Sequence, residues 1–185
     1  KSVLHIVRMR PDGMGIFGDE VKIFDGNENG QITIEGPKMY KRNGYYYIFA
    51  PAGGVKTGWQ TILRSKNPFG PYEYKVVLRQ GDSLVNGPHQ GAWVDTITGE
   101  DWFLHFQDVY AAGRITHLQP MHWENDWPII GVNKEGNDYG EPVMQYVKPN
   151  IGKIAEELKD TDKYPVCEPD TADEFDTDVT VAVEF

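Results

Sequence analysis

Short runs of alternating or wholly apolar residues follow one another along most of the chain, and each run ends at a turn signal. Examples are VLHIVRM before PDG, VKIF before DGNENG, GYYYIFA before PAGG, and YEYKVVLR before QGDS. The runs recur at a spacing of roughly 8 to 12 residues with almost no helical periodicity, a pattern typical of antiparallel β-structure. The sequence therefore predicts an all-β fold, and sandwich, barrel and propeller remain open on this evidence.

An internal repeat favours one of these three architectures. Three pairs of segments match at a separation of about 50 to 56 positions: Gly36-Pro37 with Gly87-Pro88, Tyr46–Phe49 with Trp102–His105, and Thr61–Arg64 with Thr116–Gln119. Each unit has a Gly-Pro corner, a strand, a tight turn, an aromatic strand, a loop and a third strand. A repeat of ~40 to 50 residues that holds three or four strands is typical of a propeller blade.

The sequence changes character from about Asn133. A short helical pattern, IGKIAEELKDTDKY, lies between prolines, and the acidic stretch YPVCEPDTADEFDTD then leads to one alternating run, VTVAVEF. We expect residues 1–147 to form a partial β-propeller and residues 148–185 to form a linker and one strand. That strand is either an edge strand that returns to the first domain or the first strand of a C-terminal β-sandwich domain.

Charge and cysteine content exclude several classes of function. The chain has 18 Lys and Arg against 28 Asp and Glu, a formal net charge of −10. This excess of acid argues against nucleic acid or an anionic membrane surface as a partner, because both are bound through clustered basic residues. The single cysteine, Cys167, excludes an intrachain disulfide and a cysteine-rich metal site. No apolar run approaches the ~18 residues of a membrane span. A neutral or cationic ligand fits this composition better.

Glu35 stands between a β-branched run, ITI, and the Gly36-Pro37 corner, ahead of an aromatic strand. These neighbours predict a partly desolvated site, and burial disfavours the charged form of a carboxyl group. A carboxyl group that keeps its proton near neutral pH can act as a general acid. The alternative is a structural glutamate that closes a corner through hydrogen bonds to backbone amides, and the spacing by itself favours that alternative.

Four longer motifs carry a resemblance to a known family. They are IEGPKMYKRNGYYYIFAPAGG, GWQTILRSKNPFGPYE, NGPHQGAWVDTITGEDWFLHFQD and GRITHLQPMHWENDWPIIG. In this order they resemble the third, fourth and fifth blades of glycoside hydrolase family 43, and the resemblance covers roughly residues 1–147. It implies a five-bladed β-propeller, of which this chain carries about the last three blades. It also implies β-xylosidase, α-L-arabinofuranosidase or arabinanase activity.

The resemblance assigns Glu35 a role. Glu35, in its Glu-Gly-Pro-x-x-Tyr-Lys setting, matches the family's general acid. Inversion needs an acid and a base that lie about 6.5 to 9.5 Å apart on opposite faces of the sugar. In the family the base and a third carboxyl group, both aspartates, lie in the first two blades, upstream of a segment like KSVLHIVRMRPDG. Asp12 and Asp19 stand in turn contexts, so we assign neither of them to these roles.

His89, in Gly-Pro-His-Gln-Gly, matches a histidine that in the family faces a hydrated ion, usually calcium, at the centre of the propeller. Calcium prefers oxygen ligands, so water molecules would supply most of its coordination. We therefore expect a structural calcium ion near His89 and no organic cofactor. The alternative is a histidine that makes structural hydrogen bonds only.

Other residues are candidates for contact with the sugar. Arg114 matches an arginine that reaches the bound sugar in the family, and a guanidinium group suits vicinal hydroxyl groups because its donors are fixed in one plane. Gln90 and Gln107 could hydrogen-bond to hydroxyl groups, and Trp59 and Phe106 could offer rings for stacking. For each of these five residues a purely structural role is the alternative.

Two functions follow from these observations. The first is an exo-acting hydrolase that removes terminal xylose or arabinofuranose from xylo- or arabino-oligosaccharides of plant hemicellulose. The second is a non-catalytic propeller piece, carbohydrate-binding or structural, that lacks the general base. An interaction propeller of the WD or kelch kind is disfavoured because its dipeptide signatures are absent. The motif Asp170-Thr-Ala-Asp-Glu-Phe resembles the junction at which many family members enter a C-terminal β-sandwich.

Overall fold

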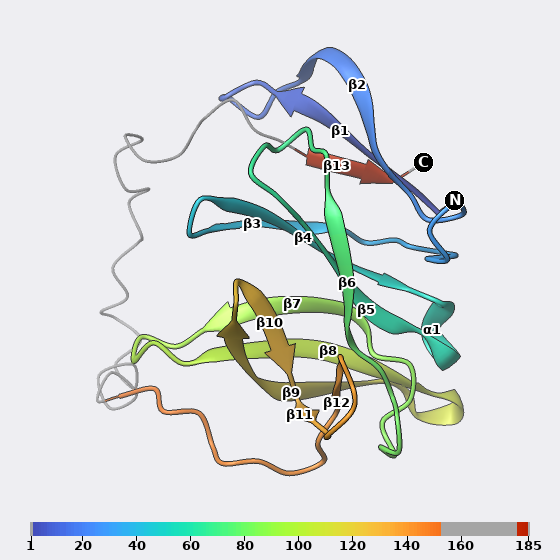
Figure 1. Ribbon diagram of the computed structural model, residues 1–185, viewed down its shortest axis with the longest axis vertical. Helices are drawn as coiled ribbons and strands as arrows, with labels where there is room; N and C mark the ends of the chain where they lie inside the picture. Colours follow the sequence, from blue (N-terminus) through green and yellow to red (C-terminus); the bar gives the residue numbers. More distant parts are fainter. Residues whose placement is uncertain (1, 153–180, 185) are drawn as a thin grey trace.

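A computed structural model describes residues 2–152 and 181–184 of the chain. These residues form three β-sheets that follow one another along the molecule (Figure 1). The helices in this part, α1 (Gly54–Thr57) and the 3₁₀ turn η1 (Tyr110–Ala112), have four and three residues. No helix among the described residues is long and apolar enough to cross a membrane. The structure confirms the all-β prediction.

The first sheet holds the two ends of the described chain. Its strand order is β13 (Val181–Glu184), β1 (Val3–Met9) and β2 (Ile16–Asp25). β13 runs antiparallel to β1, with Val181 opposite Val7 and Glu184 opposite Leu4. Most of the helical pattern that begins at Ile151 and the whole junction-like motif at Asp170 lie outside the described residues, so the division at residue 147 remains a prediction.

The second and third sheets are meanders in chain order. The second runs β3 (Lys38–Arg42), β4 (Tyr45–Ala52), β5 (Trp59–Ser65) and β6 (Glu73–Leu78). The third runs β7 (His89–Asp95), β8 (Asp101–Val109), β9 (Gly113–Glu124) and β10 (Trp127–Ile130). Each matched segment of the repeat therefore occupies the same strand of its sheet, and each sheet begins directly after a Gly-Pro corner.

The middle sheet is buried on both faces, and the alternation of side chains along its strands explains how. Tyr47 and Phe49 of β4 pack with Phe103 and Met121 of the third sheet in one apolar cluster. Ile48, Ala50 and Ala52 point the opposite way and pack in a second cluster with Leu4 and Phe24 of the first sheet. Successive side chains of a strand lie on opposite faces. The apolar, aromatic run GYYYIFA thus joins all three sheets.

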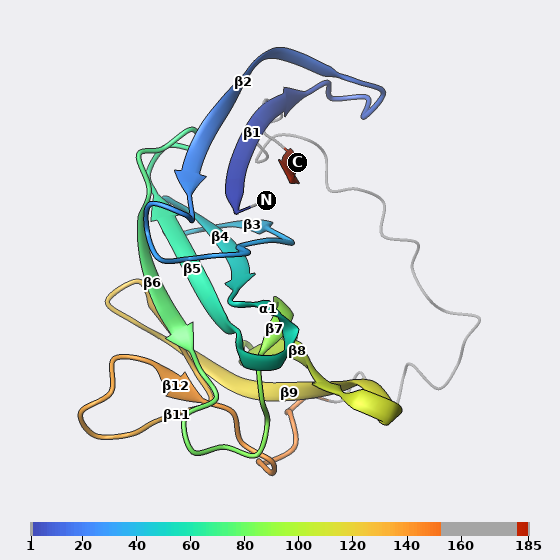
Figure 2. The ribbon, with the colours of Figure 1, turned by 90° about the vertical axis from the view of Figure 1, so that its right-hand side faces the viewer.

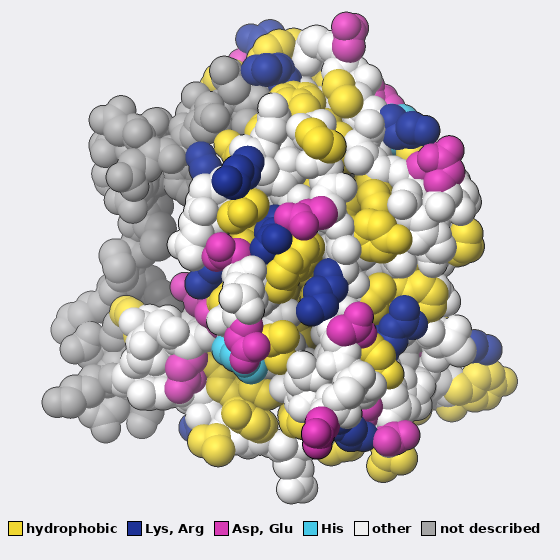
Figure 3. Space-filling view, viewed as in Figure 1, with side chains coloured by type: hydrophobic (Ala, Val, Ile, Leu, Met, Phe, Trp, Pro, Cys, Tyr) yellow, Lys and Arg dark blue, Asp and Glu magenta, His cyan; other side chains and the backbone are white. Residues whose placement is uncertain are grey.

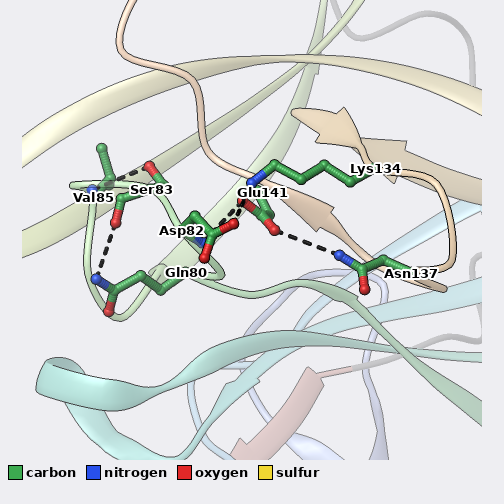
Figure 4. Close-up of polar contacts among 7 residues, drawn as sticks. All are labelled: Gln80, Asp82, Ser83, Val85, Lys134, Asn137 and Glu141. Carbon is green, nitrogen blue, oxygen red and sulfur yellow. Dashed lines mark hydrogen bonds and ion pairs between the residues drawn. The ribbon is translucent and has the colours of Figure 1, made fainter.

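A later hairpin extends the middle sheet. β11 (Val132–Asn133) pairs with β12 (Gly140–Glu141), and β12 lies parallel to the end of β6. Figure 4 shows how side chains of this hairpin meet the loop that follows β6. Lys134 Nζ lies 2.7 Å from the buried Glu141 carboxylate and 2.9 Å from Asp82. The Asp82 amide also donates to Glu141 at 3.0 Å. These contacts among Lys134, Glu141 and Asp82 fix the loop that leads to His89.

Figure 2 looks at the end of the molecule that carries α1, with the three sheets following one another from top to bottom. On the face drawn in Figure 3, basic and acidic side chains are interspersed with hydrophobic ones, and no large area carries one sign of charge. The Gly-Pro corner before β3 lies at the α1 end, because the Glu35 amide donates to the Pro51 carbonyl and the Gly53 amide to the Ile32 carbonyl there. The corner before β7 lies at the same end, because Asn86 Nδ2 donates to the Lys56 carbonyl of α1. The candidate site is built at this end.

Candidate active site

Glu35 is held by the backbone at the end of β4. Its amide donates to the Pro51 carbonyl at 3.0 Å, and the Gly53 amide donates to the Ile32 carbonyl at 2.8 Å. Ile34, between these two contacts, is fully buried. The corner is thus fixed by main-chain hydrogen bonds and one apolar anchor, as the β-branched run before it predicts.

The Glu35 side chain instead meets a histidine from the next sheet. His89, the first residue of β7, has its Nε2 atom 2.7 Å from Glu35 Oε1. The His89 side chain has no exposed surface, whereas that of Glu35 keeps 26% of its own. One carboxyl oxygen is therefore fixed by the imidazole while the group stays within reach of a ligand.

The surroundings of His89 favour one arrangement of its proton. Nδ1 is buried and has no hydrogen-bond partner among the described residues. A proton on Nδ1 would be a buried donor without an acceptor, which costs roughly 1 to 3 kcal/mol. We therefore infer that the neutral ring carries its proton on Nε2 and donates it to Glu35. An Nε2–H group can donate to a carboxyl oxygen of Glu35 both before and after that group has given up a proton.

Two more of the predicted site residues, Phe106 and Arg114, lie next to the contact between Glu35 and His89. The Phe106 ring meets the His89 ring edge-on, with centroids 5.9 Å apart. The Arg114 guanidinium lies 4.6 Å from the centroid of the Phe106 ring. The line of contacts thus begins at Glu35, before β3, and crosses three neighbouring strands of the third sheet through His89, Phe106 and Arg114. Arg114 itself is exposed, so its donors can reach a ligand.

Gln90 supports the corner that carries Glu35. It adopts a left-handed backbone conformation, with φ of 52°, at the irregularity between β7 and β8. Its carboxamide lies against Gly36, which has φ of 53°, and a Cβ added to Gly36 would overlap that carboxamide. Glycine is required here by both the backbone conformation and the close approach. Contact of Gln90 with a sugar remains a prediction.

Trp59 and Gln107 are held by partners inside the protein. Trp59 Nε1 donates to Gln31 Oε1 at 2.7 Å, and the Arg79 guanidinium lies 4.6 Å from the Trp59 ring centroid. Gln107 Nε2 donates to the Leu84 carbonyl at 3.0 Å, and its Oε1 lies 3.0 Å from His117 Nε2. None of these contacts joins Trp59 or Gln107 to Glu35. Their proposed contact with a sugar is not tested by these contacts.

Sequence reasoning missed the direct contact between Glu35 and His89, since it placed His89 against a hydrated ion. A signal for the contact was present in the repeat. Gly36-Pro37 and Gly87-Pro88 are equivalent corners, so the residues beside them lie at the same end of adjacent sheets. Sequence reasoning also missed the buried Gln31, which accepts hydrogen bonds from both Trp59 and Thr61.

The donor set near His89 does not by itself fit calcium. Within the part of the chain that the structure describes, no three His, Cys, Asp or Glu side chains are grouped to hold a metal ion. Glu35 and His89 supply one carboxylate and one imidazole, whereas calcium takes about six to eight oxygen ligands. We assign no step to a metal ion, and calcium near His89 remains a prediction.

Comparison with known proteins identifies the family. The sequence pattern of glycosyl hydrolases family 43 matches residues 1–128. This chain belongs to glycoside hydrolase family 43. A Xylanibacter ruminicola protein, provisionally named a β-xylosidase, is 50% identical over 142 residues, which are 77% of this chain and 26% of that protein. The non-reducing end α-L-arabinofuranosidase BoGH43B of Bacteroides ovatus is 35% identical over 66% of this chain and 25% of its own length.

Solved structures show the same family 43 fold. The crystal structure of xylan β-1,4-xylosidase from Bacillus halodurans C-125 superimposes with a TM-score of 0.61 at 26% identity. The match covers 75% of this chain and 28% of that one. The three sheets are therefore blades of the family 43 propeller, and the chain spans about a quarter of the length of the relatives it matches.

Proposed function

We propose that this chain belongs to an exo-acting glycoside hydrolase that removes terminal xylose or arabinofuranose from plant hemicellulose oligosaccharides with inversion. The observation that carries the proposal is the hydrogen bond between Glu35 and His89, at adjacent blade corners of a family 43 chain. The names of the relatives support the sugar classes. The non-catalytic alternative has no comparable support.

Glu35 acts as the general acid in this proposal. Its carboxyl group passes a proton to the glycosidic oxygen as the bond between that oxygen and the anomeric carbon breaks. A water molecule, deprotonated by the general base, forms the new bond from the opposite face. His89 positions Glu35, because its Nε2 atom fixes one carboxyl oxygen and donates to the carboxylate that remains after proton transfer.

The general base lies elsewhere in the proposal. Asp12 is an exposed turn residue whose carboxylate accepts hydrogen bonds from Arg10 at 2.9 Å and from the Met14 amide at 3.0 Å. Because both of its oxygens accept hydrogen bonds within the turn, the Asp12 carboxylate stabilises the turn and is a poor candidate for the base that activates water. The family resemblance places the base and the third carboxyl group in blades that precede the three in this chain.

Arg114 is proposed to bind hydroxyl groups of the terminal sugar. Its guanidinium is exposed and lies over Phe106, which in turn contacts His89. This line of contacts supports the proposal, because the fixed planar donors of a guanidinium group suit vicinal hydroxyl groups.

The reaction is tested with the complete gene product on 4-nitrophenyl β-D-xylopyranoside and 4-nitrophenyl α-L-arabinofuranoside. Proton NMR of the first-formed sugar gives its anomeric configuration before mutarotation. We expect turnover of one or both substrates and a first product of inverted configuration. A product of retained configuration, or turnover of neither substrate, contradicts the proposal.

A further inference from the structure

A cavity lies at the opposite end of the third sheet from Glu35. It has a volume of about 670 Å³ and is lined in part by Trp102, Trp123 and Tyr146. On β7 and β8, His89 pairs with Phe106 at the Glu35 end and Asp95 pairs with Asp101 at the other. Asp101 and Phe106 are separated by roughly 17 Å of extended strand. A ligand in this cavity is therefore too far away to touch Glu35.

Aromatic side chains shape the cavity. The Trp102 and Tyr146 rings meet edge-on, with centroids 5.9 Å apart. Trp102 is buried, whereas 60% of Tyr146 is exposed. Trp123 is anchored by Tyr47 and Trp93, with ring centroids 4.9 and 5.1 Å away. The cavity thus has a fixed aromatic base and one exposed ring that can lie against a flat apolar surface.

Two carboxylates give the cavity its polar character. Asp101 Oδ1 accepts the indole proton of Trp93 at 2.6 Å. Glu100 Oε2 accepts the indole proton of Trp102 at 3.1 Å and the Asn150 amide at 2.8 Å. These donors are neutral, so they orient both carboxylates without cancelling their charge. Oriented carboxylate oxygens are good acceptors for hydroxyl groups.

The charge balance of the lining selects against anions. Arg42 also lines the cavity, but its guanidinium lies 3.4 Å from Asp126 and 4.3 Å from the Trp123 ring centroid. The negative charges of Glu100 and Asp101 are therefore not offset by a free cation among the lining residues. A ligand with many hydroxyl groups, apolar ring faces and no negative charge fits these constraints.

We propose that this cavity is a second, non-catalytic binding site for a neutral oligosaccharide. Its volume of about 670 Å³ lies within the usual range for small-molecule sites, roughly 300 to 1,000 Å³. The choice of a xylose-containing oligosaccharide rests on the proposed function. The location of the cavity, the exposed Tyr146 ring and the carboxylates of Glu100 and Asp101 do not depend on the proposed function. The site would hold the polymer while its chain end is cleaved elsewhere.

The test is a titration of the 185-residue chain with xylotriose, followed through the indole N–H signals of its tryptophans. We expect the signal of Trp102, which lines the cavity and donates its indole proton to Glu100, to shift. Tyr146→Ala should weaken binding at this site at least 10-fold. Tyr110→Ala is the matched control, because Tyr110 is 96% exposed and lies at the turn between β8 and β9.

Glu35→Gln separates this inference from the proposed function. The variant should bind xylotriose at the cavity as the unaltered chain does, whether or not Glu35 is the acid. If the complete gene product keeps its turnover in Glu35→Gln, the assignment of Glu35 as the acid is wrong. If the Trp102 signal still shifts in the same variant, the second site is supported. An unshifted Trp102 signal, equal loss in the Tyr146 and Tyr110 variants, or equally tight binding of trigalacturonate would overturn the second site.

Discussion

His89 Nε2 lies 2.7 Å from Glu35 Oε1, although the two residues are 54 positions apart in the chain. The contact joins the corners of two adjacent blades, each of which begins with Gly-Pro. A buried imidazole thus fixes a partly exposed carboxyl group. The backbone of Glu35 fixes the position of its Cα atom, and His89 of the neighbouring blade fixes the position of its carboxyl group.

Replacing His89 should damage the acid step selectively. In His89→Ala the Glu35 carboxyl group loses its fixed partner, so we expect kcat/KM for xylobiose to fall on the order of 10-fold or more, since general acids contribute about 10²- to 10⁴-fold. Turnover of 4-nitrophenyl xyloside, whose leaving group needs little protonation, should fall less. A thermal melt of the variant checks its fold. Equal losses on both substrates would contradict a positioning role.

Gly36→Ala tests the support that Gln90 gives to the corner. An added Cβ would overlap the Gln90 carboxamide and displace the segment that carries Glu35. Gly44→Ala is the matched control, because Gly44 also has a positive φ, 76° against 53°, but an added Cβ there meets nothing within 4 Å. Both variants should lose about 1 kcal/mol of stability from backbone strain. Only Gly36→Ala should also lower kcat/KM. Equal activity in the two variants would contradict the proposal that Gln90 supports the corner that carries Glu35.

Gly91→Ala should destabilise the interface between the second and third sheets. A Cβ at Gly91 would overlap the fully buried Phe103 ring, which packs against Phe49. Overpacking of a core costs about 1 to 3 kcal/mol. Gly15→Ala is the control, because the nearest atom to its added Cβ is Arg10 Cδ at 3.6 Å, an ordinary contact. Denaturant unfolding measures both, and a Gly91 variant as stable as the control would contradict the packing described above.

His105 should make stability fall in mild acid. Burial lowers the pKa of the His105 imidazole from 6.5 to about 4. The unfolded chain therefore binds a proton between these pH values while the folded chain does not, so stability falls as the pH drops from 6.5 to 4. The loss from this group amounts to about 3 kcal/mol at 1.36 kcal/mol per pH unit.

The measurement is the free energy of unfolding at several pH values between 4 and 7. His105→Gln should flatten the dependence on pH. His122→Gln, at an exposed position on β9, should leave it as it is in the unaltered chain. An unchanged slope in His105→Gln would show that other groups carry the acid sensitivity.

The strands and the repeat could be predicted because their signals are local. Alternating side chains and turn residues mark GYYYIFA and its counterpart in β8 without reference to the rest of the chain. The two-residue strands β11 and β12 gave no such signal, since a strand of that length has no period. They are defined by backbone pairing with each other and with β6, and Lys134 contacts Asp82 and Glu141 beside them.

The candidate site was predicted in part for a related reason. Glu35 is marked by its own neighbours, and its place at a blade corner is as expected. The partners of Trp59 and Gln107, by contrast, are Gln31 and the Leu84 carbonyl, which come from loops distant in sequence. Whether a side chain faces a ligand or another loop depends on such contacts, and residue type does not determine them.

The most direct test of the account is the leaving-group dependence of Glu35→Gln in the complete gene product. Glutamine keeps the shape of the side chain but has no carboxylic proton to give. The account predicts that kcat/KM for xylobiose falls about 10²- to 10⁴-fold, and that an activated aryl xyloside retains far more of its turnover. Xylobiose hydrolysis at the unaltered rate, or an equal loss on both substrates, would contradict the assignment of Glu35 as the general acid.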